Sequence, residues 1–378
     1  MNRPYRKAQK RIRFSRSGKI ENNWIVQLFC PIVRVIKHHH KKEEAMNKKM
    51  LVKGMLLTLC LALIPFLAVS AHAQKPIELA FALHTAPGGP DHAAVQKFKE
   101  TVESQSKNRL KVNLFPGAQL GGERDNLEQL KQGEVALTQS GGLDISLLAP
   151  EYGALSTPYV FPTIESVFKA WEGPIGKGIR DAFLTKEKVH VLGYQRRGAR
   201  MLTAKKEIKN PDALKGLKLR LPEIPDWVAV WKELGALPTV VAWPEVFGAL
   251  QTGVVDGQEN PLYLIYTTKL YEVQSHVMLT SHVHNCFDWL MSDKVLTSLP
   301  KDLQDLVLKS AKEASAYGDK LTMEQEEDYK KKLAEKGMKV VQVDLQAFMA
   351  KTKPAVEKIR PKWAPGVYEE VQKLTAAK

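Results

Sequence analysis

Residues 217–261 read "LKLRLPEIPDWVAVWKELGALPTVVAWPEVFGALQTGVVDGQENP". Two short apolar runs in this stretch, 217–221 and 238–242, are typical of β-strands, and the segments that follow them, 222–235 and 243–253, are typical of helices. Strands that alternate with helices at this spacing indicate βαβ units, which build parallel sheets. The stretch therefore predicts an α/β fold.

The same alternation continues on both sides of this stretch. Strands are expected at 77–83, 111–115, 135–140, 190–195 and 200–204, and helices at 90–106 and 123–133. Residues 300–337 predict one long helix that is charged on one side, ends at Gly337 and is long enough to cross between two lobes. With 378 residues, 44% of them hydrophobic, the chain is expected to form about two domains.

The positive charge of the chain is concentrated at its N-terminus. The formal net charge is +15, but residues 1–53 hold 15 Lys or Arg against 3 Glu, a net charge of +12, which leaves only +3 for the rest. A surface that binds DNA or RNA needs its positive charge on the folded part of the chain. The charge therefore gives no reason to expect a nucleic-acid partner.

A cleavable signal peptide is predicted at residues 46–73. "MNKKMLVKGM" supplies a cationic start, 54–69 an apolar segment, and Ala71-His72-Ala73 a cleavage site that leaves Gln74 as the first mature residue. The apolar segment has 16 residues, which is short for a helix that spans a membrane. We therefore expect cleavage after Ala73 and a periplasmic protein without stable membrane insertion.

Residues 1–45 precede this signal peptide and show no helical or strand period. A start codon assigned too early explains them most simply. The alternatives are a basic arm that binds nucleic acid, or metal binding by His38, His39 and His40.

Cleavage of the leader also removes two of the three cysteines, Cys30 and Cys60. A single cysteine cannot form an internal disulfide, so none is expected in the mature chain. Cys286 lies in the apolar stretch "NCFDWLM", which favours a small buried side chain over a nucleophile.

Polar side chains follow several of the expected strands at their carboxyl ends. Gln139 and Ser140 end one strand, Arg220 ends another, and Asp256, Glu259 and Asn260 follow a third apolar run. Ligands of open α/β sheets bind beyond the carboxyl ends of the strands. These residues are therefore candidates for a binding site.

Arg220 and Arg200 carry the chemistry that recognises a carboxylate. A guanidinium is a planar fork of N–H donors that matches a carboxylate in a bidentate pair. The alternative on position alone is that both are surface arginines or ion-pair partners of acidic helices.

The residues around Pro244 and Pro261 have structural explanations as well. Trp243 is either a flat wall for a ligand or a hydrophobic staple against Phe247. Asn260, directly before Pro261, fits the N-cap of the next helix, in a turn at the mouth of a cleft. Asp256 and Glu259 would repel an anionic ligand, so we expect them to position the arginines or the turn.

Metal and enzyme chemistry find little support. His282 and His284 share the face of an expected strand, and His276 is near, but no matching carboxylate or cysteine accompanies them, which favours structural or surface histidines. The chain has no G-x-S-x-G, H-E-x-x-H, P-loop or G-x-G-x-x-G motif after a strand. We expect no metal, no cofactor and no catalytic residue.

Several segments together resemble the solute-binding proteins of tripartite ATP-independent periplasmic (TRAP) transporters, the DctP type. The main one is "NPDALKGLKLRLPEIPDWVAVWKELGALPTVVAWPEVFGALQTGVVDGQENP" (210–261), and the others are "FPGAQLGGERDNLEQLKQGEVALT" (115–138), "STPYVF" (156–161) and "YEVQSHVMLTSHVHN" (271–285). The resemblance covers nearly all of 76–340.

The resemblance implies an α/β, two-lobed periplasmic-binding-protein architecture with mixed sheets, a long crossing helix and an interlobe cleft that encloses an organic acid. Arg220 matches the arginine that pairs with the ligand carboxylate, and Arg200 matches a second arginine of sialic-acid-binding members. Asn260 matches a ligand-contacting asparagine, and Trp243 stands where many members have phenylalanine. We expect lobe I from 74–197 plus 286–325, and lobe II from 198–285 plus 326–378.

The sequence also differs from some members of that family. "TQSGG" (138–142) has no acidic residue where sialic-acid binders carry glutamate, and the carboxylate-rich motif of the metal-dependent keto-acid binders is missing. The opposite wall of the cleft is expected to contain Gln139, Ser140, His84, Tyr159 and Asn285. The sequence does not decide between a C4-dicarboxylate, an aromatic or hydroxy acid, and a sugar acid.

The implied partners are an organic carboxylate and the small and large membrane subunits of a TRAP transporter, and the protein itself is expected to be a monomer. Two alternatives stay open: a sensory or adaptor protein that delivers the acid to a receptor, and a periplasmic enzyme that acts on small acids.

Overall fold

The computed structural model describes residues 75–376. The predictions for residues 1–45, the signal peptide at 46–73 and its cleavage after Ala73 lie outside the described residues, as do His38 to His40, Cys30 and Cys60. Within 75–376, every helix is too short or too polar to cross a membrane.

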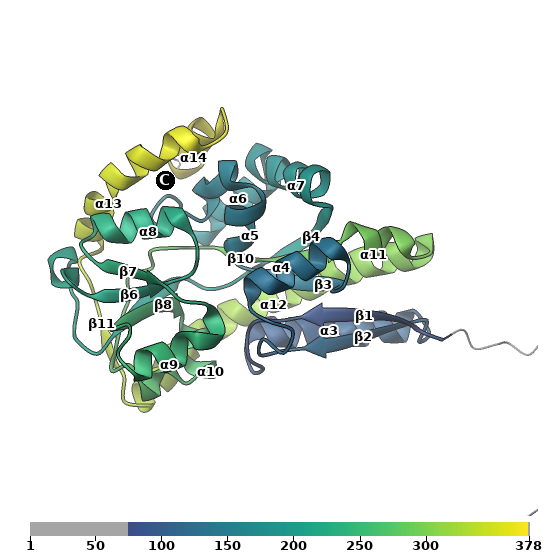
Figure 1. The fold of residues 1–378 in the computed structure, drawn as a ribbon, viewed down its shortest axis with the longest axis horizontal. Helices are drawn as coiled ribbons and strands as arrows, with labels where there is room; N and C mark the ends of the chain where they lie inside the picture. The colour runs from purple at the N-terminus through teal and green to yellow at the C-terminus, as the bar shows by residue number, and fades with distance from the viewer. Residues whose placement is uncertain (1–74, 377–378) are drawn as a thin grey trace, which may run out of the picture. The chain divides into compact units, whose positions relative to one another are not determined.

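The first sheet has the strand order β2-β1-β3-β10-β4 (Figure 1). Its central strand β3 runs parallel to β1, whereas β10 is antiparallel to both β3 and β4. The bounds are β1 Ile77–Ala82, β2 Leu110–Phe115, β3 Leu137–Ser140, β4 Val189–Arg196 and β10 Cys286–Ser292. The sheet is therefore mixed, because β10, which comes from much later in the sequence, runs antiparallel to both of its neighbours.

The second sheet has the order β11-β9-β5-β8-β6-β7. Strands β6, β7 and β8 run parallel to one another, and β5 is antiparallel to both β8 and β9. The bounds are β5 Arg200–Ala204, β6 Lys218–Leu221, β7 Leu237–Val240, β8 Gly257–Pro261, β9 His276–Met278 and β11 Lys339–Val341.

Helices connect the strands and cover the sheets. Those of the first half are α3 Pro90–Gln105, α4 Glu123–Gln132, α5 Leu143–Leu148, η2 Pro150–Leu155, α6 Ile164–Glu172 and α7 Pro174–Glu187. Those of the second half are η3 Pro211–Leu214, α8 Pro225–Glu233, η4 Trp243–Glu245, α9 Val246–Gln251, α10 Leu262–Thr267, η5 Leu270–Glu272, α11 Asp293–Ser298, α12 Lys301–Glu335, α13 Leu345–Ile359, η6 Arg360–Lys362 and α14 Val367–Ala376.

Local sequence explains many of these boundaries. Pro90 begins α3, where its missing N–H costs nothing because the first helical amides have no partner within the helix. Asp125 accepts a hydrogen bond from the backbone N–H of Gly122 at the start of α4, and Gly133 ends the helix with φ of 77°. The strands and helices predicted around 77–140 are confirmed.

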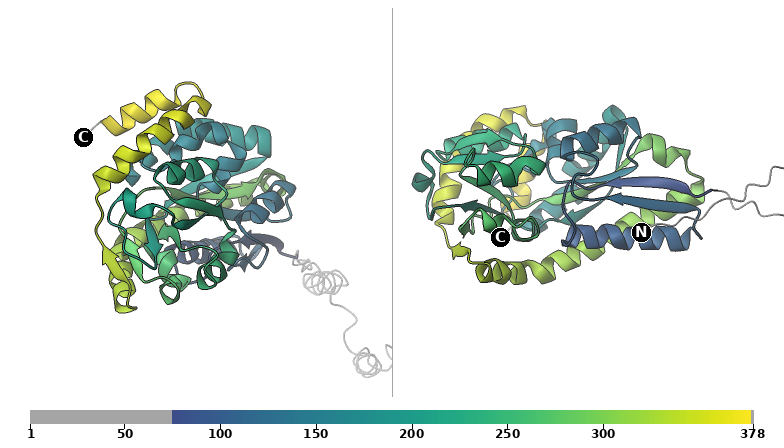
Figure 2. Two further views of the ribbon diagram at one scale, coloured as in Figure 1. Left: turned by 60° about the vertical axis from the view of Figure 1, so that its left-hand side comes forward. Right: turned by 60° about the horizontal axis from the view of Figure 1, so that its bottom comes forward.

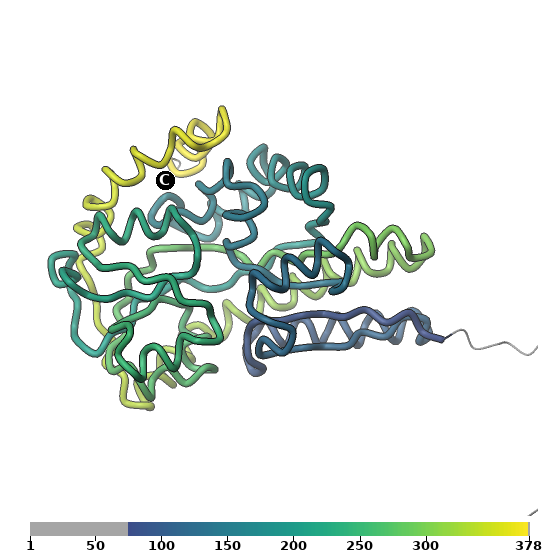
Figure 3. Tube along the Cα trace, viewed as in Figure 1, coloured from purple at the N-terminus to yellow at the C-terminus, as the bar shows by residue number. Residues whose placement is uncertain are grey.

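One long helix belongs to both halves of the structure. Helix α12 packs against α3 and β4 of the first sheet and against α10 and β11 of the second, as Figure 2 shows from two sides. Its buried residues Leu303, Val307, Ala311 and Ala314 recur every three or four positions, which places them on one face. The predicted crossing helix is therefore confirmed. The chain, traced in Figure 3, also passes between the two sheets at 197–199, which join β4 to β5, and at 279–285, which join β9 to β10.

The structure corrects the prediction for residues 256–261. Instead of a turn, Gly257–Pro261 form the strand β8, buried along its whole length between β5 and β6. Asn260 does not cap α10, because the residue that precedes this helix is Pro261 and no side chain caps it. The prediction that His282 and His284 lie on a strand was also wrong, because both lie in the segment that joins β9 to β10.

The C-terminal helices contact elements from both halves. Helix α13 packs against α8, whereas α14 packs against α6 and α7, and Figure 1 shows both in yellow over these helices. The lobe boundaries at 197/198, 285/286 and 325/326 stay a proposal, and α14 contacts the helices assigned to lobe I although it falls within the range assigned to lobe II.

Candidate ligand-binding site

Buried polar side chains from both sheets meet at one cavity. His84, Gly141 and Pro222 follow β1, β3 and β6, so the cavity lies where carboxyl ends of parallel strands meet, as expected for a ligand site. The space is only about 20 Å³. The lining residues are His84, Glu123, Gly141, Leu143, Arg197, Arg200, Arg220, Pro222, Ile224, Trp227, Trp243 and Asn260.

Two larger hollows of about 460 Å³ each lie elsewhere on the described part of the chain. One is lined by residues of β4, α7 and α12, and the other mainly by α13 and α14. Neither is lined by strands of both sheets. The smaller cavity is the better candidate because several buried charged groups converge on it.

Arg220, on β6, has free donors at this cavity. Its side chain is 3% exposed, its Nε donates a hydrogen bond of 2.8 Å to the carbonyl oxygen of Val241, and its guanidinium lies 5.7 Å from the ring centroid of Trp243. Burial lowers the pKa of Arg220 to about 10, so the group stays protonated at neutral pH. The two terminal nitrogens have no hydrogen-bond partner among residues 75–376, so they are available to a carboxylate.

Arg200, on β5, is largely occupied by another residue. Its Nη2 donates to Oε1 of Glu259 at 2.8 Å and to the backbone oxygen of Glu259 at 2.7 Å, and its Nε donates to Oε2. The guanidinium also lies 4.8 Å from the ring centroid of Trp227. Both charges of the pair are buried, so removing either partner would lower the free energy of unfolding by about 3–5 kcal/mol.

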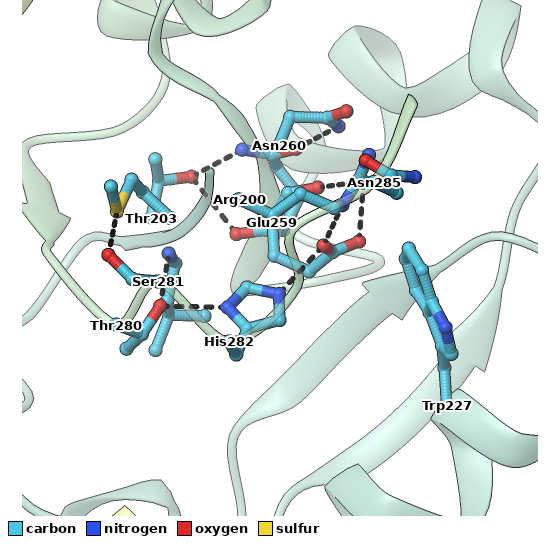
Figure 4. Close-up of polar contacts among 12 residues, drawn as sticks. Arg200, Thr203, Trp227, Glu259, Asn260, Thr280, Ser281, His282 and Asn285 are labelled. Carbon is cyan, nitrogen blue, oxygen red and sulfur yellow. Dashed lines mark hydrogen bonds and ion pairs between the residues drawn. The ribbon is translucent and has the colours of Figure 1, made fainter. Parts of the chain in front are cut away.

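Glu259 connects Arg200 to a buried histidine, as Figure 4 shows. Its Oε2 is 2.9 Å from Nε2 of His282, whose Nδ1 is 2.8 Å from the hydroxyl of Thr280. Burial raises the pKa of Glu259, but Arg200 and His282 outweigh this and hold it at about 2. This is the positioning role that the sequence predicted for Glu259. Asp256 contacts backbone and not an arginine: its carboxylate accepts a hydrogen bond from the backbone N–H of Lys218, at the start of β6.

Histidines do not gather into a metal site in the region that the structure describes. Residues 75–376 contain no cluster of three or more His, Cys, Asp or Glu side chains that could hold a metal ion. His282 is completely buried and hydrogen-bonded on both ring nitrogens. His282 is therefore a structural histidine, one of the two roles that the sequence favoured for it.

Asn260 and Trp243, two residues of the predicted site, both line the cavity. Asn260 reaches it from β8, where its Nδ2 donates to Oε1 of Gln258 at 2.7 Å. Trp243 begins the short helix η4. Trp243 and Phe247 are both partly buried and pack against the same apolar cluster, so the Trp243 ring lines the cavity and also covers the core.

The residues predicted for the opposite wall lie in different places. His84 lines the cavity, whereas Ser140 and Asn285 are not among its lining residues and bond to residues that are: Ser140 donates to Glu123, and Asn285 donates to the backbone oxygen of Gly141. Gln139 is buried on β3 and is not among the lining residues. Tyr159 does not line this cavity. It lines the hollow beside α13 and α14, and its hydroxyl donates to the backbone oxygen of Thr280.

Two charged lining residues, Arg197 and Glu123, were missed by the sequence reasoning. Arg197 precedes Gly198 in the segment that joins β4 to β5, and Glu123 is the first residue of α4. The only sequence signal for Arg197 is its place in "QRRGAR", directly before a short connection between two strands. Glu123 gives no such signal, since an acidic residue in a first helical turn is ordinary.

A family model described as "Bacterial extracellular solute-binding protein, family 7" matches residues 81–362. A solute-binding protein of Roseobacter denitrificans is 35% identical to this chain over 315 residues, which are 82% of this chain and 96% of that protein.

Solved structures show the same similarity. A TRAP periplasmic solute binding protein from Roseobacter denitrificans with bound L-galactonate has a TM-score of 0.74 and 34% identity, over 79% of this chain and 99% of that one. Another, from Shewanella oneidensis with bound succinate, has a TM-score of 0.76 and 27% identity, over 79% and 99% of the two chains.

Proposed function

The chain belongs to the bacterial extracellular solute-binding proteins of family 7, and on this premise we propose that it captures an organic acid in the cavity between its two sheets and delivers it to a TRAP-type transporter. The acid is held by a salt bridge between its carboxylate and Arg220.

The observation that carries this proposal is the state of the Arg220 guanidinium. It is buried and charged, and its terminal nitrogens have no partner among the described residues. A buried charge without a counterion is unfavourable, and a bidentate carboxylate supplies both the charge and the acceptors, at about 1.5–3 kcal/mol per charged hydrogen bond. Trp243 and Asn260 flank this site and line the same cavity.

The small size of the cavity supports a mechanism of opening and closure. A space of about 20 Å³ is comparable with that of one water molecule, so an acid of several carbons enters only when the two lobes separate, and the lobes then close around it less tightly than in the arrangement described here. A bound acid that contacts both lobes stabilises the closed arrangement, because only that arrangement satisfies both ends of the ligand.

Cleavage of the leader after Ala73 releases the monomeric protein into the periplasm, where the closed form docks on the small and large membrane subunits. A receptor in place of the transporter is the alternative destination, and uptake of the acid by membrane vesicles that contain the two subunits distinguishes them. Turnover of the bound acid by the purified protein would instead indicate an enzyme.

The replacement Arg220→Ala is expected to weaken acid binding at least about 100-fold, because it removes the counterion of the carboxylate. A thermal-shift screen of carboxylic acids, including L-galactonate and succinate, first identifies an acid that binds. An acid present at about 100 times its Kd should stabilise the protein by about 2.7 kcal/mol. Calorimetric titration of that acid then compares the two proteins.

Arg109→Ala is a suitable control, because Arg109 forms an exposed ion pair with Asp302 and neither residue is among the lining residues. It should leave the Kd unchanged. Tight binding by the Arg220→Ala protein would rule out the anchor role of Arg220.

A further inference from the structure

Arg197 reaches the cavity from the segment that joins the two sheets. Its side chain is 5% exposed, its Nη1 donates a hydrogen bond of 3.0 Å to the backbone oxygen of Gly141, and its guanidinium lies 4.4 Å from the ring centroid of Phe287. Its Nε is buried and has no partner within residues 75–376. Arg197 is therefore held in place on one side and keeps a donor that is unused by the protein.

Glu123 lies on the other side of the same glycine. Its Oε1 accepts the backbone N–H of Gly141 at 2.8 Å and the hydroxyl of Ser140 at 2.6 Å. Glu123 and Arg197 thus hold the N–H and the C=O of Gly141, and all three residues line the cavity. The two side chains form a neighbouring acceptor and donor at one end of the site.

Gly141 is required for this arrangement. A Cβ atom at this position would lie 2.1 Å from Nη1 of Arg197, which is far too close. The backbone of Gly141 does not have positive φ, so conformation alone does not demand glycine here. The glycine is explained by the close approach of the arginine.

The charges of the cavity divide into two pairs and one unbalanced group. Arg200 is paired with Glu259. Burial raises the pKa of Glu123, but the neighbouring His84 and Arg197 and its hydrogen bonds lower it below the usual value, so Glu123 is ionised and offsets Arg197. Burial lowers the pKa of His84 to about 4, so His84 is neutral at pH 7.

Only the charge of Arg220 is therefore left for a ligand. A single carboxylate neutralises it. A second carboxylate at the Arg197 end would face the carboxylate of Glu123, and like charges in a buried site are strongly unfavourable. A hydroxyl group suits that end better, because it can accept from Arg197 and donate to Glu123 at the same time.

We infer that Arg197 and Glu123 form a specificity-determining subsite for hydroxyl groups, so that the ligand is a monocarboxylic acid that also carries hydroxyl groups. The inference rests on the proposed function, because it takes the carboxylate to be bound at Arg220. It distinguishes a polyhydroxy acid from a dicarboxylate of the same length.

The first test compares six-carbon acids that differ only in the groups under discussion. A set of aldonates (D-gluconate, D-galactonate, L-galactonate and D-mannonate) carries hydroxyls, hexanoate has none, and adipate has a second carboxylate. Calorimetric titration of the full chain should give the tightest binding for an aldonate. Tighter binding of adipate or hexanoate than of every aldonate would overturn the inference.

The second test uses Arg197→Gln with Arg196→Gln as the matched control. Arg196 is the neighbouring arginine, but it pairs with Asp319 and Glu165 and does not line the cavity. Arg197→Gln should weaken binding of the best aldonate about 10- to 100-fold and of hexanoate less than about threefold, since only the aldonate uses this donor. An equal loss for both acids would show a merely structural role.

Glu123→Gln should produce opposite changes for two ligands. Removing the negative charge should strengthen binding of adipate and weaken binding of the aldonate, because the second carboxylate is no longer repelled and one hydroxyl loses a charged acceptor. A general loss of folding cannot give changes of opposite sign. Equal changes for the two acids would contradict the inference.

Gly141→Ala provides a variant that leaves both charged residues in place. The new methyl group should displace Arg197 and reproduce the selective loss of aldonate binding, and the double variant with Arg197→Gln should lose no more than the worse single variant. Additive losses would contradict the inference. A protein that binds none of the acids would instead disprove the proposed function, and binding that survives Arg220→Ala would disprove only the anchor.

Discussion

Three buried arginines face one cavity, and their partners determine what each can bind. Arg200 is neutralised by Glu259, Arg197 is held by Gly141, and Arg220 makes one hydrogen bond to the described residues, from its Nε. The same residue type therefore serves as a structural ion pair, a tethered donor and a free cation. Burial strengthens each role, because a charge without a partner is more unfavourable away from water.

The titration of His84 should affect stability at mildly acidic pH. Burial lowers the pKa of His84 from 6.5 to about 4, so between these values the unfolded chain binds more protons than the folded one. The free energy of unfolding should therefore fall as the pH falls through this window, by up to about 1.4 kcal/mol per pH unit from this group.

The measurement is urea unfolding of the wild type and of His84→Gln at pH 7.5 and pH 5.0. Other buried groups titrate in both proteins, so the difference between the two free energies isolates His84. The wild type should lose more stability than the variant on acidification. Identical losses would show that His84 is not the group responsible.

Sequence reasoning at this scale identified residue types but not their partners. Arg220 and Arg200 both match a carboxylate-binding pattern, and only the fold shows that Glu259 occupies one of them. Arg197 was missed because its importance comes from the approach to Gly141, a residue 56 positions away in the chain. A linear pattern does not contain such contacts.

The strand β8 shows how tertiary structure overrides local preference. Residues 257–261 contain glycine, asparagine and proline, which favour a turn, yet they pair with β5 and β6 in the second sheet. The polar side chains are tolerated because each has a partner: Gln258 bonds Thr203, and Asn260 bonds Gln258. The turn prediction was wrong because these partners come from the sheet.

Two helical glycines should respond oppositely to alanine. A Cβ at Gly176 of α7 would lie 2.0 Å from the backbone oxygen of Trp171, whereas nothing lies within 4 Å of a Cβ at Gly248 of α9. Gly176→Ala should destabilise the protein by about 2–3 kcal/mol through overpacking against main chain. Gly248→Ala should stabilise it by about 0.5–1 kcal/mol, because alanine favours the helix.

The two variants serve as controls for each other in chemical unfolding under the same conditions. A lower midpoint for Gly176→Ala and a higher one for Gly248→Ala is the expected pair of results. If both midpoints move in the same direction, the close packing between α6 and α7 is not what constrains Gly176.

At the scale of the whole molecule, the order of elements was predictable because strand and helix periods are local. The helix α12 was also predictable, since 35 helical residues with charges on one side are too long for a single lobe. The mixed strand directions were predicted only from the family resemblance. Local patterns could not predict them, because β10 pairs with β3 and β4 from a distant part of the sequence.

Closure of the two lobes should be measurable at the rim of the cavity. Arg124 of α4 and Glu223, which follows β6, are joined by an ion pair of 2.8 Å between Nε and Oε2. Both side chains are about half exposed, so their replacement costs little. Spin labels at Arg124→Cys and Glu223→Cys therefore report the separation of the lobes.

The experiment measures the label-to-label distance distribution by electron double resonance, in a chain with Cys30→Ser and Cys60→Ser. Cys286 is 3% exposed and should not react with the label. Without the acid, the distribution should include a longer distance, because a cavity of about 20 Å³ cannot admit the ligand while closed. Addition of the acid should shift the population to the short distance, and Arg220→Ala should abolish the shift. An unchanged distribution in a protein that demonstrably binds the acid would mean that the ligand enters without separation of the lobes, and the closure mechanism would have to be abandoned.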